Sequence, residues 1–168
     1  MKNNKIIISG PPGSGKTTII NELNNRGYLC LAEINPSDIC NKVIKNDKFL
    51  LSEFLFKKRQ KQYLQSYDQI TFYDRSIIDV VAYLIYWNKP YPKKWDIVIK
   101  NLQYYNNIFY TPCWKKIYTK NNYRKENFNE SVRIDKVLKK TYLNFNYNIT
   151  EIPKLDVIER VDFILNNI

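Results

Sequence analysis

Residues 8–18 read ISGPPGSGKTT, and this stretch decides which fold the rest of the chain can build. The chain has only four glycines, and three of them, Gly10, Gly13 and Gly15, lie here. Residues 10–17 match the pattern G-x-x-x-x-G-K-[ST] at every fixed position. Glycine adopts backbone conformations that other residues reach only at a cost, so its concentration predicts a loop whose main chain approaches a ligand closely.

The sequence around this loop supplies the expected strand–loop–helix context. An apolar run at 5–9 precedes it, and residues 15–25 follow with a helical apolar pattern. Inward-pointing N–H groups and the positive end of a helix together bind phosphate. We therefore expect ATP and Mg²⁺ as cofactors, with Lys16 at the terminal phosphates and Thr17 as a magnesium ligand. The predicted nucleotide-binding residues are Gly10, Pro11, Pro12, Gly13, Ser14, Gly15, Lys16, Thr17 and Thr18.

Apolar runs alternate with helical periodicity along the whole chain, which is typical of an α/β protein. The strands are expected at 5–9, 28–32, 69–73, 108–111 and 147–152. The helices are expected at 15–25, from a start at 35–38, at 48–66, 76–87 and 93–105, around 134–145 and at 155–166. This order predicts a three-layer α/β/α P-loop NTPase fold with a five-stranded, doubly wound parallel sheet and a helical lid.

Length and composition narrow the class of protein. The 168 residues suit one domain spanning 1–168. No apolar run is long enough to span a membrane, and the N-terminal run is too short for a signal peptide, so we expect a cytoplasmic protein without a membrane partner. The absence of histidine excludes Ser-His and Cys-His catalysis. The net charge of +11 indicates a polyanionic partner or, as we favour, the codon bias of an AT-rich genome.

The third predicted strand is followed by charged residues suited to phosphate chemistry. Asp74 is predicted to hold Mg²⁺ together with Thr17, and Arg75 to grip a phosphate and stabilise the transferring group. Because Arg75 stands where helicase-like and motor ATPases have Glu, and 88–91 reads NKPY without the GTPase aspartate, those classes are disfavoured. Ser76 and Asp79 are expected to form a helix capping box.

These motifs resemble two related groups of proteins. The DRS at 74–76 is similar to the D/E-R-S/Y of nucleoside and thymidylate kinases. Nearly the whole chain resembles small single-domain P-loop proteins described as AAA-family ATPases or predicted kinases, through the glycine loop, Glu33, DRSIID with Tyr83, Arg124 and the C-terminal ERVDFIL. The resemblance implies nucleotide chemistry, with Glu33 placed to take a proton from the acceptor hydroxyl.

Two basic stretches are candidates for further roles. Residues 115–125 carry several cations and no acid, and lie within a predicted lid at about 113–130 that could close Arg124 over the γ-phosphate. The alternative is a nucleic-acid contact with bases stacked on Tyr118 or Tyr123. Arg59, in the helix expected at 48–66, is interpreted as part of a solvated charge run; the alternative is that its helix face holds a planar or phosphorylated acceptor.

The sequence thus favours a Mg-ATP-dependent phosphotransferase acting on an unidentified small molecule, such as a nucleoside or nucleotide. The predicted catalytic residues are Lys16, Asp74, Arg75, Glu33 and Arg124. Two alternatives stay open: an NTP hydrolase or nucleotide-gated switch, and an ATP-dependent nucleic-acid-binding protein or polynucleotide 5′-kinase. A nucleic-acid partner is the less favoured.

Overall fold

The computed structural model describes residues 3–35, 39–65, 67–119 and 126–168. Within them, five strands form one sheet in the order β2-β3-β1-β4-β5, and every neighbouring pair is parallel. The strands are β1 (Lys5–Ser9), β2 (Leu29–Leu31), β3 (Thr71–Asp74), β4 (Asn107–Tyr110) and β5 (Asn148–Glu151). This arrangement confirms the predicted doubly wound α/β fold.

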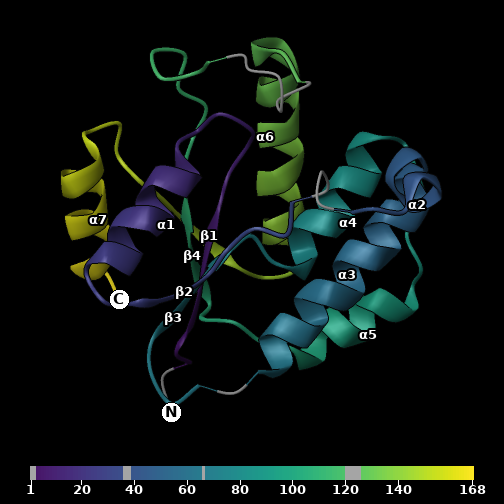
Figure 1. Ribbon diagram of the computed structural model, residues 1–168, viewed down its shortest axis with the longest axis horizontal. Coiled ribbons are helices and arrows are strands. Elements are labelled where there is room, and N and C mark those ends of the chain that lie inside the picture. Colours follow the sequence, from purple (N-terminus) through teal and green to yellow (C-terminus); the bar gives the residue numbers. More distant parts are fainter. Residues whose placement is uncertain (1–2, 36–38, 66, 120–125) are drawn as a thin grey trace.

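Helices cover both faces of the sheet, as Figure 1 shows: α1 and α7 lie on one side, and α3, α4, α5 and α6 on the other. The helices are α1 (Lys16–Asn25), α2 (Lys42–Asn46), α3 (Lys48–Leu64), α4 (Ile77–Tyr86), α5 (Lys94–Asn101), α6 (Phe128–Asn144) and α7 (Val157–Leu165). None of these helices is long and apolar enough to cross a bilayer.

The apolar residues of β1 alternate between the two halves of the core. Ile6 and Ile8 pack with buried residues of α1 and α7, whereas Ile7 packs with those of α3, α4, α5 and α6. Successive side chains of a strand point to opposite faces, and this central strand is covered on both. The unbroken apolar run at 5–9 therefore belongs to a strand buried between two helical layers.

One predicted helix boundary differs from the structure, and another falls outside the described residues. Residues 36–38, within the helix start expected at 35–38, lie outside the described residues; the next described helix is α2, capped by the Asn41 side chain. The helix expected at 93–105 ends at Asn101. Past its end, the backbone N–H of Tyr105 donates to Lys5 O at 2.8 Å, so the chain already runs beside β1.

The topology gathers four connections at the carboxyl edge of the sheet. β1 leads into the glycine loop, β2 toward Glu33, β3 into Arg75 and β4 into Thr111. Because the strands are parallel, their carboxyl ends share one edge, which is where open α/β sheets bind ligands.

Candidate nucleotide-binding site

The glycine loop is shaped by contacts that exclude side chains. Gly10 has φ +150°, and a Cβ atom there would lie 2.1 Å from Thr111 Oγ1 and 2.4 Å from Thr111 O. Gly15, with φ +85°, is the left-handed N-cap of α1. The Ser14 and Thr111 hydroxyls lie 2.6 Å apart and tie the loop to the end of β4. The backbone of residues 10–15 thus forms a concave surface, free of side chains at Gly10 and Gly15, at the start of a helix, which suits phosphate binding and is called the cradle below.

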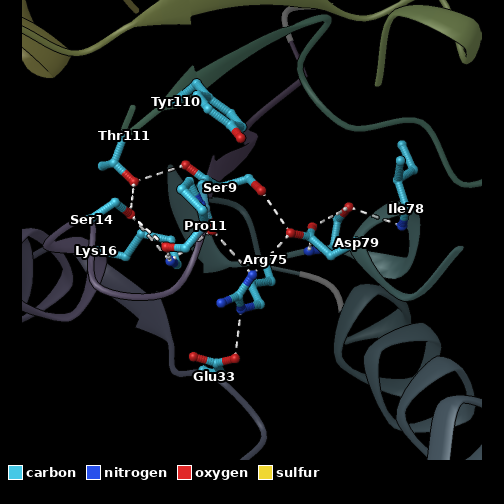
Figure 2. Close-up of polar contacts among 12 residues, drawn as sticks. Ser9, Pro11, Ser14, Lys16, Glu33, Arg75, Ile78, Asp79, Tyr110 and Thr111 are labelled. Atoms are coloured by element: carbon cyan, nitrogen blue, oxygen red, sulfur yellow. Dashed lines mark hydrogen bonds and ion pairs between the residues drawn. The ribbon is translucent and has the colours of Figure 1, made fainter. Parts of the chain in front are cut away.

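Lys16 turns back over this loop. Its Nζ donates to Gly10 O at 2.8 Å and to Pro11 O at 2.9 Å, and its side chain is buried (Figure 2). Burial, followed by the neighbouring Arg75 guanidinium, lowers the pKa of Lys16 to about 7, although nearby carboxylates oppose the shift. A polyphosphate in the cradle would stabilise the ammonium form.

Arg75 connects the glycine loop to two carboxylates. Its Nε donates to Glu33 Oε1 at 2.6 Å, and its Nη1 donates to Gly10 O at 3.2 Å and lies 3.4 Å from Asp79 Oδ1 (Figure 2). The residue has φ +72°, a conformation that costs energy for any side chain other than glycine. The buried guanidinium is therefore fixed beside the cradle by its surroundings.

Glu33 is held at the rim of the site by this ion pair, with 35% of its side chain exposed. Partial burial opposes its ionisation, but the positive charges of Arg75, Lys16 and Arg59 prevail and lower the pKa of the carboxyl. Glu33 is consequently ionised at neutral pH and orients Arg75.

The Asp74 carboxylate is buried, and one of its oxygen atoms accepts no hydrogen bond within the described chain. Only 6% of the residue is exposed, and its Oδ1 has no hydrogen-bond partner within the described chain. Burial, reinforced by the negative charge of Glu33, raises the pKa of Asp74 to about 6. An orphaned carboxylate oxygen fits a hard cation such as Mg²⁺, and the exposed Thr17 hydroxyl is a second oxygen donor. The described residues hold no cluster of three or more acidic or cysteine ligands, so a bound Mg²⁺ would need oxygens from phosphate and water as well.

The contacts of Asp79 confirm the predicted capping box and include two further hydrogen bonds. The Ser76 side chain and the Asp79 carboxylate form the predicted capping box of α4. The same carboxylate, fully buried, accepts from Ser9 Oγ at 2.6 Å and from the Tyr142 hydroxyl. It therefore joins the end of β1, the start of α4 and the last turns of α6 beneath the site.

The structure corrects one interpretation and leaves others untested. Arg59 is not in a solvated charge run: it is 5% exposed and its Nη1 donates to Ser76 O at 2.8 Å. Arg124 and the other residues of 120–125 lie outside the described residues. The pairing of Thr17 with Asp74 around Mg²⁺ stays a prediction.

Sequence analysis missed three polar residues that contact the loop. Thr111 was assigned only to a strand, Ser131 Oγ donates to Pro12 O at 2.7 Å, and Arg160 Nη2 donates to Ser14 O at 3.1 Å. One signal was present for Arg160, because it falls on the apolar face of the last helix, three residues after Val157 and four before Ile164.

A glycine cradle at the end of the first strand of a parallel sheet, with a buried lysine folded over it, defines a P-loop protein. The chain belongs to the family described as AAA domain, whose model matches residues 5–160. Its fold is similar to that of deoxyadenosine kinase from M. mycoides, in a structure with the products dCMP and dCDP, at 19% identity and a TM-score of 0.71 over 97% of each chain. It is also similar to thymidylate kinase from Ehrlichia chaffeensis, at 15% identity and a TM-score of 0.66 over 98% of each chain. No curated protein matches the sequence.

Proposed function

We propose that this protein is a Mg-ATP-dependent phosphotransferase that acts on a small-molecule acceptor. The observation that carries the proposal is the convergence of Lys16 and Arg75 on the carbonyl of Gly10, with the Glu33 carboxylate bound to Arg75. Two buried cations beside a bare main-chain cradle suit a phosphate group whose charge changes during transfer. Membership of the AAA family and the nucleotide-kinase fold support the same reading.

Each residue has a distinct part in this proposal. Loop N–H groups and Lys16 would hold the donor phosphates, and Arg75 would stabilise the transferring group. Thr17 and Asp74 would hold Mg²⁺, which when bound neutralises phosphate charge. Glu33 would keep Arg75 in place and meet the acceptor hydroxyl.

A cavity beside Glu33 favours a small acceptor over a macromolecule. It has a volume of about 520 Å³, within the range of small-molecule sites, and is lined by apolar residues such as Phe54 and by polar ones such as Lys58 and Gln62. We further propose one domain over 1–168 with a lid over about 113–130, in which Arg124 closes on the donor.

Calorimetry and thermal melting with Mg-ATP test the donor site. Saturation at about 100 times Kd adds roughly 2.7 kcal/mol, a rise of about 5–10 °C in Tm for a protein of this size. Lys16→Met should abolish this rise while the protein stays folded, because the methionine fills the same buried space. Lys100→Met, at an exposed position on α5, is the matched control and should retain the full rise. A wild-type protein that binds no nucleoside triphosphate would contradict the proposal.

An acceptor screen tests the transfer reaction. ADP release is followed with nucleosides and nucleoside monophosphates, and a true acceptor should raise the rate well above that in water alone. Turnover that ignores every acceptor would instead identify a hydrolase or nucleotide-gated switch.

A further inference from the structure

Arg160 is a buried cation without an anion. Only 3% of it is exposed, and among the described residues no carboxylate lies within ion-pair distance of its guanidinium. Its Nε has no hydrogen-bond partner there either. A buried charge without a counter-charge is costly, and burial lowers the pKa of Arg160. Such an arrangement is expected where a ligand supplies the missing anion.

Arg160 lies directly beside the glycine loop. Its Nη2 donates to Ser14 O at 3.1 Å, and a Cβ at Gly15 would lie 2.7 Å from its Nη1. The absent side chain of Gly15 therefore makes room for the guanidinium at the phosphate cradle itself. Trp114 closes the other side, with its ring centre 5.8 Å from Arg160 Cζ.

The sheet order shows which end of the ligand Arg160 would meet. Glu33 and Arg75 follow β2 and β3, on one side of β1, whereas Trp114 and Arg160 follow β4 and β5, on the other. If the transferring phosphate lies toward Glu33 and Arg75, as the proposed function has it, the nucleoside end of the donor extends toward Arg160.

We propose that Arg160 is a binding residue for the donor nucleotide, with its guanidinium as the counter-cation of the phosphate next to the nucleoside. This inference rests on the proposed function and adds a residue from the last helix to the donor site. A phosphate there would accept from the guanidinium and supply the negative charge that the described protein lacks.

The test compares Arg160→Met with Arg26→Met by calorimetry. Arg26, the C-cap of α1, pairs with Asp162 of α7, so its loss disturbs the same pair of helices without touching the loop. Because Arg160 would make a charged hydrogen bond in a buried site, we expect Arg160→Met to weaken the binding of ATP and of ADP equally, on the order of 10- to 100-fold. Arg26→Met should stay within about 3-fold of wild type. Melting without nucleotide should show little change for Arg160→Met, because the lost hydrogen bond to Ser14 O is offset by removal of a buried charge that has no counter-charge.

The remaining outcomes separate this inference from the proposed function. If wild type and both variants bind ATP equally, Arg160 does not bind the donor nucleotide, but the nucleotide site itself is still supported. A loss confined to ATP would place Arg160 at the terminal phosphate and overturn the assignment. If Arg160→Met does not fold, Arg160→Gln removes the charge but keeps a polar side chain, and wild-type affinity in that variant would also overturn it. A wild type that binds no nucleotide refutes the proposed function itself.

Discussion

Two buried side chains of the site have pKa values close to neutrality, one of each sign. Burial raises the pKa of Asp74 to about 6 and lowers that of Lys16 to about 7. The folded protein therefore disfavours the Asp74 carboxylate and the Lys16 ammonium unless a group of opposite charge binds beside each. If a magnesium–polyphosphate complex binds as proposed, it brings both opposite charges, and until then the burial of these two side chains costs the protein stability.

Replacing Asp74 should stabilise the protein in a pH-dependent way. Because the folded pKa is raised, ionisation of Asp74 lowers stability as the pH rises toward 6. The free energy of unfolding of Asp74→Asn should thus exceed that of wild type by up to about 3 kcal/mol at pH 7. The advantage should shrink steadily as the pH falls from about 6 to about 3, because below the ordinary aspartate pKa of about 3.9 the carboxyl is protonated in both states.

Urea unfolding across this pH range measures the difference between the two proteins. Asp68→Asn, at an exposed position, is the control and should follow wild type. An Asp74→Asn advantage that did not change with pH would mean that burial of the charge is not its cause.

At the scale of elements, α6 braces the site at two points. Near its start, Ser131 Oγ donates to Pro12 O of the glycine loop. Near its end, the Tyr142 hydroxyl contacts the Asp79 carboxylate and lies 2.8 Å from Ser76 Oγ. A rigid helix anchored in this way keeps the loop and the start of α4 in a fixed relation.

Removing the Tyr142 hydroxyl should cost stability out of proportion to its size. Tyr142→Phe leaves the buried Asp79 charge with one donor fewer, at a cost of about 1.5–3 kcal/mol. Leu143→Ala, on the exposed side of the same helix, should change the free energy of unfolding by less than about 0.5 kcal/mol. Equal effects of the two substitutions in urea unfolding would show that Asp79 does not depend on Tyr142.

At the scale of the whole molecule, the net charge of +11 overstates the positive charge available to a large partner. Four of the cations, Lys16, Arg59, Arg75 and Arg160, are buried. Lys16, Arg75 and Arg160 contact the glycine loop. Arg59 donates to Ser76 O, two residues after Asp74, so these four charges belong to the candidate site and not to an outer surface.

We therefore expect no measurable oligonucleotide binding at physiological salt. Fluorescence anisotropy with a labelled single strand, from 20 to about 200 mM salt, checks this expectation. Tight binding whose logarithm falls steeply with that of the salt concentration would revive the nucleic-acid alternative, because each phosphate contact adds to the slope.

Local patterns were enough to predict the fold and the conformation of the glycine loop. The apolar run at 5–9, the glycine loop and the capping box at Ser76 each depend on residues close together in the chain. They predicted a strand, a loop and a helix start that the structure confirms. The end of the helix expected at 93–105 was wrong, because pairing of Tyr105 with Lys5 across the fold outweighs helical periodicity there.

What the sequence by itself determined was a phosphate cradle and the strand-end residues that accompany it, since these follow from short motifs with a fixed geometry. What only the tertiary structure decided was which distant side chains complete the site. Arg59 and Arg160 come from helices whose sequences read as a charged surface and an ordinary amphipathic face, and no local pattern assigned either side chain to the nucleotide site. Their burial beside the cradle depends on how α3 and α7 pack on opposite faces of the sheet, and that packing sums contacts over the whole chain.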